Sequence, residues 1–156
     1  MLLAIAVAGA VALAQTKPMQ PCQGFEAVLS TTSTSVARGK SPQFHLRLRN
    51  TSEVALRFID TRAGRRPDLG NNYYDLVLQT RAGQDVMLPT AISDPGPVSE
   101  RDYFPIEPGG SSEIGITTPM NTDELKRGSY RAYVVLRDPY GRRQECRSTV
   151  QEFRVQ

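Results

Sequence analysis

The amino-acid sequence predicts an all-β fold, a two-layer β-sandwich of about seven to nine strands with one short helical turn. Three observations support this prediction. Short runs alternate between apolar and polar residues, turn residues separate these runs at close intervals, and no long stretch has the 3.6-residue period of a helix. The chain has 156 residues, of which 39% are hydrophobic, and this length suits one domain with a single core.

The first strands of the domain differ in how clearly they alternate. Residues 25–36 are rich in Ser and Thr and are weakly patterned, whereas "FHLRLRN" (44–50) alternates cleanly and "VALRFID" (54–60) repeats the pattern, with Arg57 expected to face outward. The residues expected to face inward are Phe44, Leu46, Leu48, Val54, Leu56 and Phe58. Because only the short "NTSE" segment joins the two clear runs, we expect them to form a hairpin.

The middle of the chain contains two turn signals. "RAGQ" (81–84) lies between the strand-like runs "YDLVLQT" and "DVMLP" and predicts a second hairpin. In "EPGG", Pro108 and Gly109 occupy the two central positions of a type II turn, where the second position needs a positive φ. A strand that carries Ile114 and Ile116 follows this turn.

The last third of the chain begins with the one helical signal. "MNTDELKRG" (120–128) has Asn121 as a cap, Glu124 three residues later and Gly128 at its end. The run 130–136 then alternates as a strand, and "DPYGRR" (138–143) turns the chain back into a final strand. Val150 and the pair Phe153/Val155 have opposite parity in that strand, which predicts a β-bulge.

Tyr130, two residues after Gly128, begins the strand before the final one. In Greek-key sandwiches of the immunoglobulin type, a tyrosine at this place folds over the corner and hydrogen-bonds to the backbone a few residues upstream. We therefore interpret Gly128 and Tyr130 as a structural corner, with an ordinary core tyrosine as the alternative. The predicted fold class is an immunoglobulin-like Greek-key β-sandwich.

The N-terminal residues predict export. Residues 1–14 are apolar or small, and Ala12-Leu13-Ala14 has the small-x-small pattern that precedes signal-peptide cleavage. The predicted organisation is a signal peptide at 1–14, a lead at 15–23 and the sandwich domain at 24–156, in a secreted or periplasmic protein. The alternative is an N-terminal segment that is retained as a membrane anchor, although its length is below the roughly 20 residues of a spanning helix.

An oxidising compartment permits Cys22 and Cys146, the two cysteines of the sequence, to form a disulfide. The alternative is a pair of free core thiols. If strands run alternately up and down, "NTSE", "RAGQ", "EPGG" and "DPYGRR" fall at one end of the domain together with both cysteines. The long connections then gather at the opposite end.

Sandwiches often bind ligands through loops at one end. The residues expected to contribute to binding at the long-loop end are Arg65, Arg66, Tyr73, Tyr74, Tyr103 and Phe104. For the aromatic residues, the alternative role is core packing at strand ends.

No catalytic residue or cofactor is predicted, because the sequence lacks the motifs of nucleophilic, metal and nucleotide chemistry. The one histidine, His45, lies on the polar face of a strand. "DLGNNYYD" offers the oxygen ligands Asp68, Asn71, Asn72 and Asp75, so calcium binding stays open, although a turn explains the same residues. "NTS" at Asn50 fits the glycosylation sequon. The scattered arginines predict no nucleic-acid binding.

The segments "FHLRLRNTSEVALRF", "IEPGGSSEIGI" and "ELKRGSYRAYVVL" together resemble the immunoglobulin-like domains of many bacterial exported proteins. They are similar, more loosely, to the small intracellular proteinase inhibitors of bacilli. The resemblance covers roughly residues 25–155 and implies the sandwich fold with its corner.

These observations favour an exported, non-enzymatic module that binds a protein or cell-envelope ligand through its long-loop end. The alternative is a proteinase inhibitor that presents the loop around Pro95-Gly96-Pro97 to a protease. A third hypothesis, an enzyme that uses paired carboxylates, rests only on scattered acidic residues. The oligomeric state is not predicted.

Overall fold

The computed structural model describes residues 21–62, 73–88, 97–116, 125–137 and 145–156. These ranges contain eleven strands and one short 3₁₀ helix at Glu100–Asp102. The strands are β1 (Phe25–Thr31), β2 (Ser35–Val36), β3 (Phe44–Asn50), β4 (Leu56–Ile59), β5 (Tyr74–Thr80), β6 (Asp85–Val86), β7 (Tyr103–Ile106), β8 (Ser111–Ile116), β9 (Gly128–Leu136), β10 (Cys146–Arg147) and β11 (Gln151–Val155). In the described ranges, no helix has the length and hydrophobicity needed to cross a bilayer.

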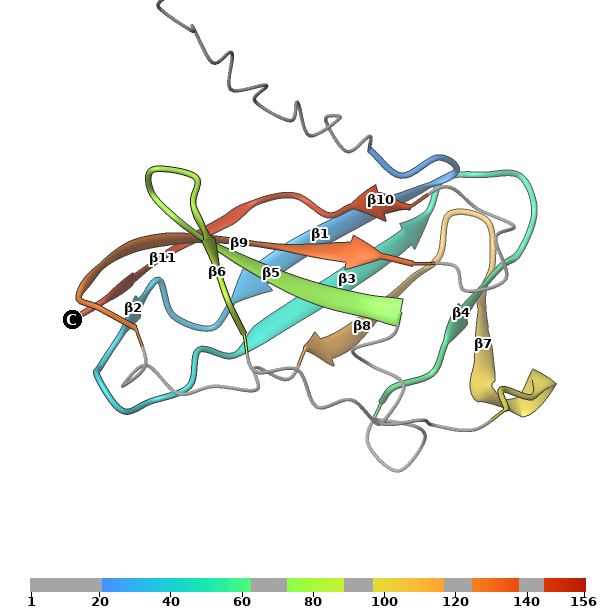
Figure 1. Ribbon diagram of the computed structural model, residues 1–156. Helices are drawn as coiled ribbons and strands as arrows, with labels where there is room; N and C mark the ends of the chain where they lie inside the picture. The colour runs from blue at the N-terminus through green and yellow to red at the C-terminus, as the bar shows by residue number, and fades with distance from the viewer. Residues whose placement is uncertain (1–20, 63–72, 89–96, 117–124, 138–144) are drawn as a thin grey trace, which may run out of the picture.

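The strands form two facing sheets and one separate pair (Figure 1). One sheet has the order β1-β3-β8, and the other has the order β2-β11-β9-β5-β6 with β10 added beside β9. Strands that are distant in sequence are neighbours in both sheets, as in a Greek key. The parallel pairing of β2 with β11 is the exception to an otherwise antiparallel arrangement of named strands. The protein is an immunoglobulin-like β-sandwich, as the sequence predicts.

The core lies between the two sheets and follows the predicted alternation. Leu46 and Leu48 of β3 are completely buried, and so are Leu78 of β5 and Val134 of β9 in the facing sheet. Apolar surface removed from water in this way contributes about 25 cal/mol per Å². Alternate residues of a strand point to opposite faces, so each strand supplies one buried face to this core.

The predicted hairpin between residues 44–50 and 54–60 is wrong. β3 pairs with β1 and β8, whereas β4 pairs with β7. Val54, which was expected to point inward, is 64% exposed. Asn50 explains the change of direction, because its buried amide donates to the carbonyls of Val54 (2.7 Å) and Ile106 (2.8 Å), and Ile106 is the last residue of β7.

The predicted placement of the short turns is correct in part, and "DPYGRR" (138–143) lies outside the described residues. The hairpin across "RAGQ" forms, with Leu78 opposite Val86. However, Arg81 donates its amide to Ser129 at the start of β9, whereas Cys146 pairs with Leu136 at the far end of β9. "RAGQ" therefore lies at the end opposite the disulfide. The prediction assumed that successive strands run alternately up and down. It failed here because β4 does not return beside β3 but pairs with β7 in a separate sheet.

The long connections likewise do not share one end. Arg137 donates its amide to Tyr73, so the residue that follows the 63–72 segment lies at the disulfide end. The turn at 37–40 lies at the other end, beside the C-terminal Gln156, whose amide donates to Val36. The loops that were expected to form one binding end are thus divided between the two ends of the sandwich.

The turn predicted at "EPGG" forms as expected. Gly109 has a φ of 74°, and Gly110 donates its amide to Glu107 at 2.8 Å. A residue with a side chain is strained at such a positive φ, which is why the second central position favours glycine.

The predicted bulge lies between β10 and β11. Arg147 is opposite Val135 and Gln151 is opposite Ala132, so residues 148–150 face only two residues of β9. The additional residue reverses the parity of the final strand. It also brings Thr149 to β1, where its amide donates to Ala27 (2.9 Å) and its hydroxyl accepts from the amide of Leu29 (3.0 Å).

The helical signal at 120–128 lies mostly outside the described residues, Asn121 and Glu124 included. Its last residues, Leu125–Arg127, are not helical, and Gly128 begins β9. The 3₁₀ helix at Glu100–Asp102 was not predicted. It is held by Asp102, whose carboxylate accepts from both the amide (2.7 Å) and the hydroxyl (2.8 Å) of Ser99.

Candidate functional site

The corner predicted at Tyr130 is present. The Tyr130 hydroxyl donates to the carbonyl of Lys126 at 2.7 Å, four residues upstream. Its ring stacks on Phe153 of β11 with ring centres 5.6 Å apart. Gly128 has a φ of 155° at the point where the chain enters β9. This arrangement fixes the entry into β9 and is structural.

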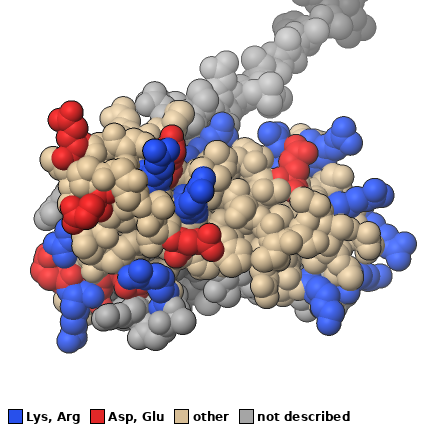
Figure 2. All heavy atoms as spheres, turned by 180° about the vertical axis from the view of Figure 1, so that it is seen from behind, with Lys and Arg blue, Asp and Glu red and all other residues tan. Residues whose placement is uncertain are grey.

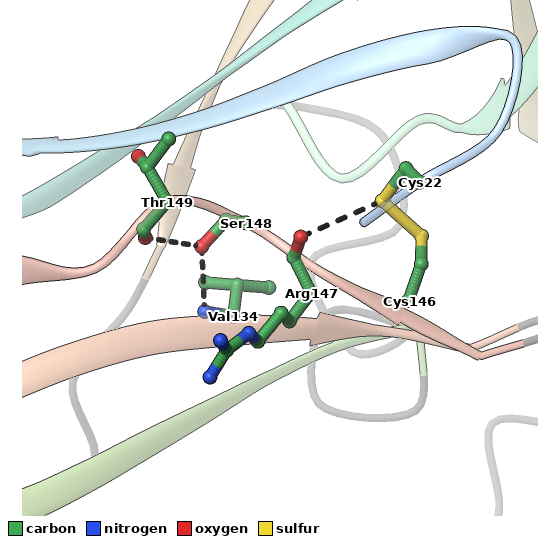
Figure 3. The surroundings of a disulfide bond; sticks show 6 residues. All are labelled: Cys22, Val134, Cys146, Arg147, Ser148 and Thr149. Carbon is green, nitrogen blue, oxygen red and sulfur yellow. Dashed lines mark hydrogen bonds between the residues drawn. A yellow bond between two sulfur atoms is a disulfide. The ribbon is translucent and has the colours of Figure 1, made fainter. Parts of the chain in front are cut away.

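The predicted disulfide joins Cys22 and Cys146 across 124 positions of sequence (Figure 3). The backbone beside it is well bonded, because the Ser148 hydroxyl accepts from the amide of Val134 (2.9 Å) and donates to the carbonyl of Thr149 (2.9 Å). The bond ties the residues just before β1 to the residues that begin β10. The bond thus links the residues before β1 of one sheet to β10, which pairs with β9 in the other sheet.

Three of the predicted binding aromatics gather where β4 meets β7 and β5. The Tyr74 hydroxyl donates to the carbonyl of Ile59 at 2.8 Å, Tyr103 pairs with Ile59, and Phe104 pairs with Phe58. Tyr74 and Phe104 are buried, whereas Tyr103 is only partly buried. Of the predicted aromatics, Tyr103 is therefore the one that remains partly exposed.

Tyr73, the fourth predicted aromatic, is also buried and directly precedes β5. Its place, like those of Tyr74 and Phe104, is the core packing that the sequence left as the alternative. Arg65 and Arg66 lie outside the described residues, so their binding role stays a prediction. The same holds for Pro95 and Gly96 of the proposed inhibitory loop.

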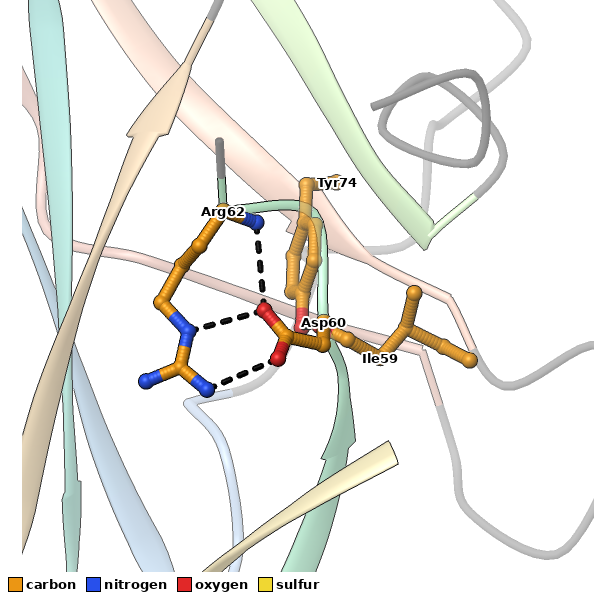
Figure 4. Close-up of polar contacts among 4 residues, drawn as sticks. All are labelled: Ile59, Asp60, Arg62 and Tyr74. Carbon is orange, nitrogen blue, oxygen red and sulfur yellow. Dashed lines mark hydrogen bonds and ion pairs between the residues drawn. The ribbon is translucent and has the colours of Figure 1, made fainter. Parts of the chain in front are cut away.

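A buried carboxylate and an arginine complete the cluster (Figure 4). Asp60, whose side chain is 6% exposed, accepts from Nε (2.8 Å) and a terminal nitrogen (2.7 Å) of Arg62. The Arg62 amide donates to the same carboxylate at 3.2 Å. Such a two-pronged pair compensates for the cost of burying a charge. The hydrogen bond to Asp60 raises the pKa of Arg62, so this arginine stays cationic.

Two arginines lie over aromatic rings at this place. The guanidinium carbon of Arg62 is 4.4 Å from the ring centre of Phe104, and that of Arg57 is 5.2 Å from the ring centre of Tyr103. Arg57 also forms an ion pair with Glu100 and donates to its carbonyl at 3.0 Å. A cation above a ring is attracted by about 0.5–1 kcal/mol at exposed sites.

We name this cluster the β4–β7 corner and define it by Arg57, Asp60, Arg62, Tyr103 and Phe104. Nearly half of each arginine side chain remains exposed, 48% for Arg57 and 46% for Arg62. Each guanidinium is held from one side by a ring and from another by a carboxylate. Both are therefore oriented before any partner arrives.

Sequence reasoning missed the two arginines and the acids that hold them. Neither Arg57 nor Arg62 is among the residues that the sequence predicts to contribute to binding. The spacing of Asp60 and Arg62 at the end of a predicted strand is the one local signal of their pairing. The partners from residues 100–104 arrive through a pairing of β4 with β7 that no local pattern indicates.

Nowhere in the described ranges do three or more His, Cys, Asp or Glu side chains come together as possible metal ligands. His45 lies 3.1 Å from Glu113 on the outer face of its sheet. Asp75 of the possible calcium loop pairs with Arg137 at 2.9 Å, whereas Asp68, Asn71 and Asn72 lie outside the described residues.

Asn50, the first residue of the glycosylation sequon, has a structural role in the folded chain. Its side chain is completely buried, and its nitrogen already donates two hydrogen bonds. Its oxygen accepts from the amide (2.8 Å) and the hydroxyl (2.7 Å) of Ser52. A glycan attached to this nitrogen is incompatible with the folded structure.

Comparisons with known proteins agree with the fold and go no further. No family model and no curated protein matches the sequence. A β-glucosidase from Listeria innocua is similar over 84% of this chain, with 14% identity and a TM-score of 0.44, and the chain spans 16% of that enzyme.

Two single domains are similar over nearly their whole length. The CARDB domain of the PF1109 protein from Pyrococcus furiosus has 8% identity and a TM-score of 0.43, with 90% of this chain and 95% of that domain covered. A PapD-like domain of human CEP192 has 12% identity and a TM-score of 0.32, with 99% and 96% covered. The similarity is that of one β-sandwich domain to another.

Proposed function

We propose that this chain is an exported, non-enzymatic β-sandwich module that binds a protein partner through the β4–β7 corner. The observation that carries the proposal is the pair of arginines, Arg57 and Arg62, each stacked on an aromatic ring and each held by a carboxylate. Arginine and tyrosine are enriched among the residues that dominate binding energy in protein interfaces.

Preorganisation supports this choice of surface. An exposed arginine loses side-chain entropy when a partner fixes it, at a cost of about 0.5–1.5 kcal/mol per side chain. At the corner this ordering has already occurred, because Phe104 and Asp60 fix Arg62 while Tyr103 and Glu100 fix Arg57. The exposed nitrogens of both arginines then suit a carboxylate or carbonyl of the partner.

Export is supported by two independent features. Residues 1–14 have the composition of a signal peptide, and the disulfide between Cys22 and Cys146 belongs to oxidising compartments. The intact mass of the protein recovered from outside the cytoplasm tests this part. Export predicts a chain from Gln15 to Gln156 that lacks two hydrogens and gains them on reduction. An uncleaved chain with two free thiols would contradict it.

The binding site is tested by capture from the extracytoplasmic fraction of the host. Immobilised wild-type protein, the double variant Arg57→Ala/Tyr103→Ala and the control Arg47→Ala are compared by quantitative mass spectrometry. Arg47 lies exposed on β3, away from the corner. Loss of two central interface residues costs about 2 kcal/mol or more, which is roughly a thirtyfold loss of affinity.

The expected result is one partner retained by the wild type and the control and lost by the double variant. Equal capture by all three proteins would refute the site. A panel of proteases at stoichiometric protein concentration separates this proposal from the inhibitor alternative. Inhibition that the double variant preserves would favour a reactive loop elsewhere.

A further inference from the structure

Six exposed cationic side chains lie together at the end of the sandwich opposite the disulfide. We name this surface the basic end, and its residues are Arg38, Lys40, Arg81, Lys126, Arg127 and Arg154. They come from segments that are far apart in the sequence, so no continuous basic run in the sequence indicates this surface. Figure 2 shows Lys and Arg side chains crowded at this end of the molecule.

Strand register brings these segments together. Arg154 of β11 pairs with Ser129 of β9, and Arg81 donates its amide to the carbonyl of the same Ser129. Lys126 and Arg127 directly precede Gly128, the first residue of β9. The turn with Arg38 and Lys40 follows β2, and β2 pairs in parallel with the end of β11. The convergence is thus fixed by backbone hydrogen bonds.

Four of the charges at the basic end, those of Arg81, Lys126, Arg127 and Arg154, differ in their ion pairing from arginines elsewhere in the described residues. Away from this end, Arg49, Arg57, Arg62 and Arg137 each form an ion pair with a carboxylate. Within the described part of the chain, Arg81, Lys126, Arg127 and Arg154 form none. Unpaired like charges held close together produce a positive potential that attracts an anionic partner.

The described residues of the basic end are mainly polar and cationic at their exposed positions. Among described residues, the exposed large hydrophobic side chains are Val54, at the opposite end, and Met87, which is one residue beyond β6. Val54 lies between β3 and β4, and Met87 follows β6 along the sheet. A protein interface normally buries an apolar or aromatic centre, and single-stranded nucleic acid normally stacks on exposed rings. The described residues of the basic end offer a partner mainly cations, which favours a partner recognised by charge.

We propose that the basic end binds the surface of an anionic phospholipid bilayer. Clustered Lys and Arg side chains bind such a surface by charge alone, each contributing roughly a fivefold gain in binding. Arginine contributes two-pronged contacts to phosphate oxygens, and four of the six side chains are arginines. This contact uses other residues than the β4–β7 corner and does not depend on the function proposed there.

The test measures partition of the full chain onto vesicles of phosphatidylcholine with and without 30% phosphatidylglycerol. The ratio of the two partition coefficients isolates the charge-dependent part of binding, because the apolar N-terminal segment contributes to both coefficients alike. Arg81→Gln/Arg127→Gln removes two charges from the basic end. The control Arg47→Gln/Arg49→Gln removes two charges from β3 and gives the same net charge.

The expected result is a ratio well above one for the wild type, about thirtyfold lower for the basic-end variant and nearly unchanged for the control. Raising NaCl to 0.5 M should abolish the preference in the wild type. If Arg81→Gln/Arg127→Gln fails to fold, as judged by circular dichroism, Lys126→Gln/Arg154→Gln replaces it.

Three outcomes would overturn the proposal. The first is a wild-type ratio of one, and the second is an equal loss in both double variants, which shows that net charge alone matters. The third is strong binding to soluble polyglutamate without vesicle binding, which assigns the basic end to an acidic polypeptide.

Discussion

Removal of the bond between Cys22 and Cys146 should lower the free energy of unfolding by several kcal/mol. The bond closes a loop with a sequence separation of 124. In the chain-entropy description, a crosslink across a loop of that length removes enough freedom from the unfolded chain to stabilise the fold by about 4.9 kcal/mol at 25 °C. Domains of this size have a total stability of roughly 5–15 kcal/mol. The bond therefore accounts for a large share of the stability.

The assay is equilibrium unfolding in urea, followed by circular dichroism, for the wild type and for Cys22→Ala/Cys146→Ala. The variant should lose about 3–5 kcal/mol, and its Tm should fall by roughly 10–20 °C. Its m-value should rise, because the unfolded chain without the crosslink exposes more surface. Wild-type protein kept reduced serves as the control, since it retains both sulfur atoms and loses only the covalent link.

The reduced wild type and the double variant should agree within about 1 kcal/mol, because the difference between them is the packing of the buried Cys146 sulfur. A loss below about 1 kcal/mol in the reduced wild type would refute the reasoning. It would show that the unfolded chain is already restricted without the bond.

Other parts of the fold give three further predictions. Tyr130→Phe should cost about 1–2 kcal/mol in urea unfolding, because the Lys126 carbonyl loses its donor while the ring still packs, and an unchanged midpoint would contradict the corner bond. Asn50→Ala should cost about 3 kcal/mol or more, since buried carbonyls at Val54 and Ile106 lose their donors, and Asn50→Asp should not restore the loss. Burial raises the pKa of Tyr133, so its contribution to stability is fully present below about pH 10 and is lost as pH rises through the folded-state pKa. Tyr133→Phe should therefore lose less stability than the wild type between pH 8 and pH 11, and equal losses would exclude this group.

The sequence predicted those parts of the fold that depend on patterns among neighbouring residues. The buried faces of β3 and β9 follow alternation, the turn at Gly109 follows from the need for a positive φ, and the bulge follows from the parity of Val150 against Phe153. Each of these signals needs only a few neighbouring residues. Local periodicity is reliable where one face of a strand is buried.

The part that failed depends on which strand pairs with which. β4 has only four residues, and the alternation of Val54, Leu56 and Phe58 looks the same for a hairpin with β3 as for a pairing with β7. Asn50 favours the pairing of β4 with β7, because its hydrogen bonds to the carbonyls of Val54 and Ile106 direct the chain toward β7. Such a contact between residues 56 positions apart leaves no local trace.

Only part of the candidate site could be predicted from the sequence, again because strand pairing leaves no local signal. Tyr103 and Phe104 were found because aromatics at the ends of strands stand out in a sequence. Arg57 and Arg62 were not, because an arginine on a polar face looks alike whether it is solvated or stacked on a ring. The basic end was hidden for a related reason, since its charges are adjacent only after β9 and β11 have paired.

The disulfide also determines how the folded chain responds to mechanical tension. A pull between residue 21 and residue 156 passes from Cys22 directly to Cys146 and then along residues 147–156. The 124-position span between the two cysteines carries no load while the bond is intact. Extension is limited to the last ten residues, about 35 Å, and requires β11 to separate from β9 and β2. The covalent tension therefore bypasses the chain from β1 to β9, which includes the β4–β7 corner, whereas separation of β11 removes Phe153 and Val155 from the core.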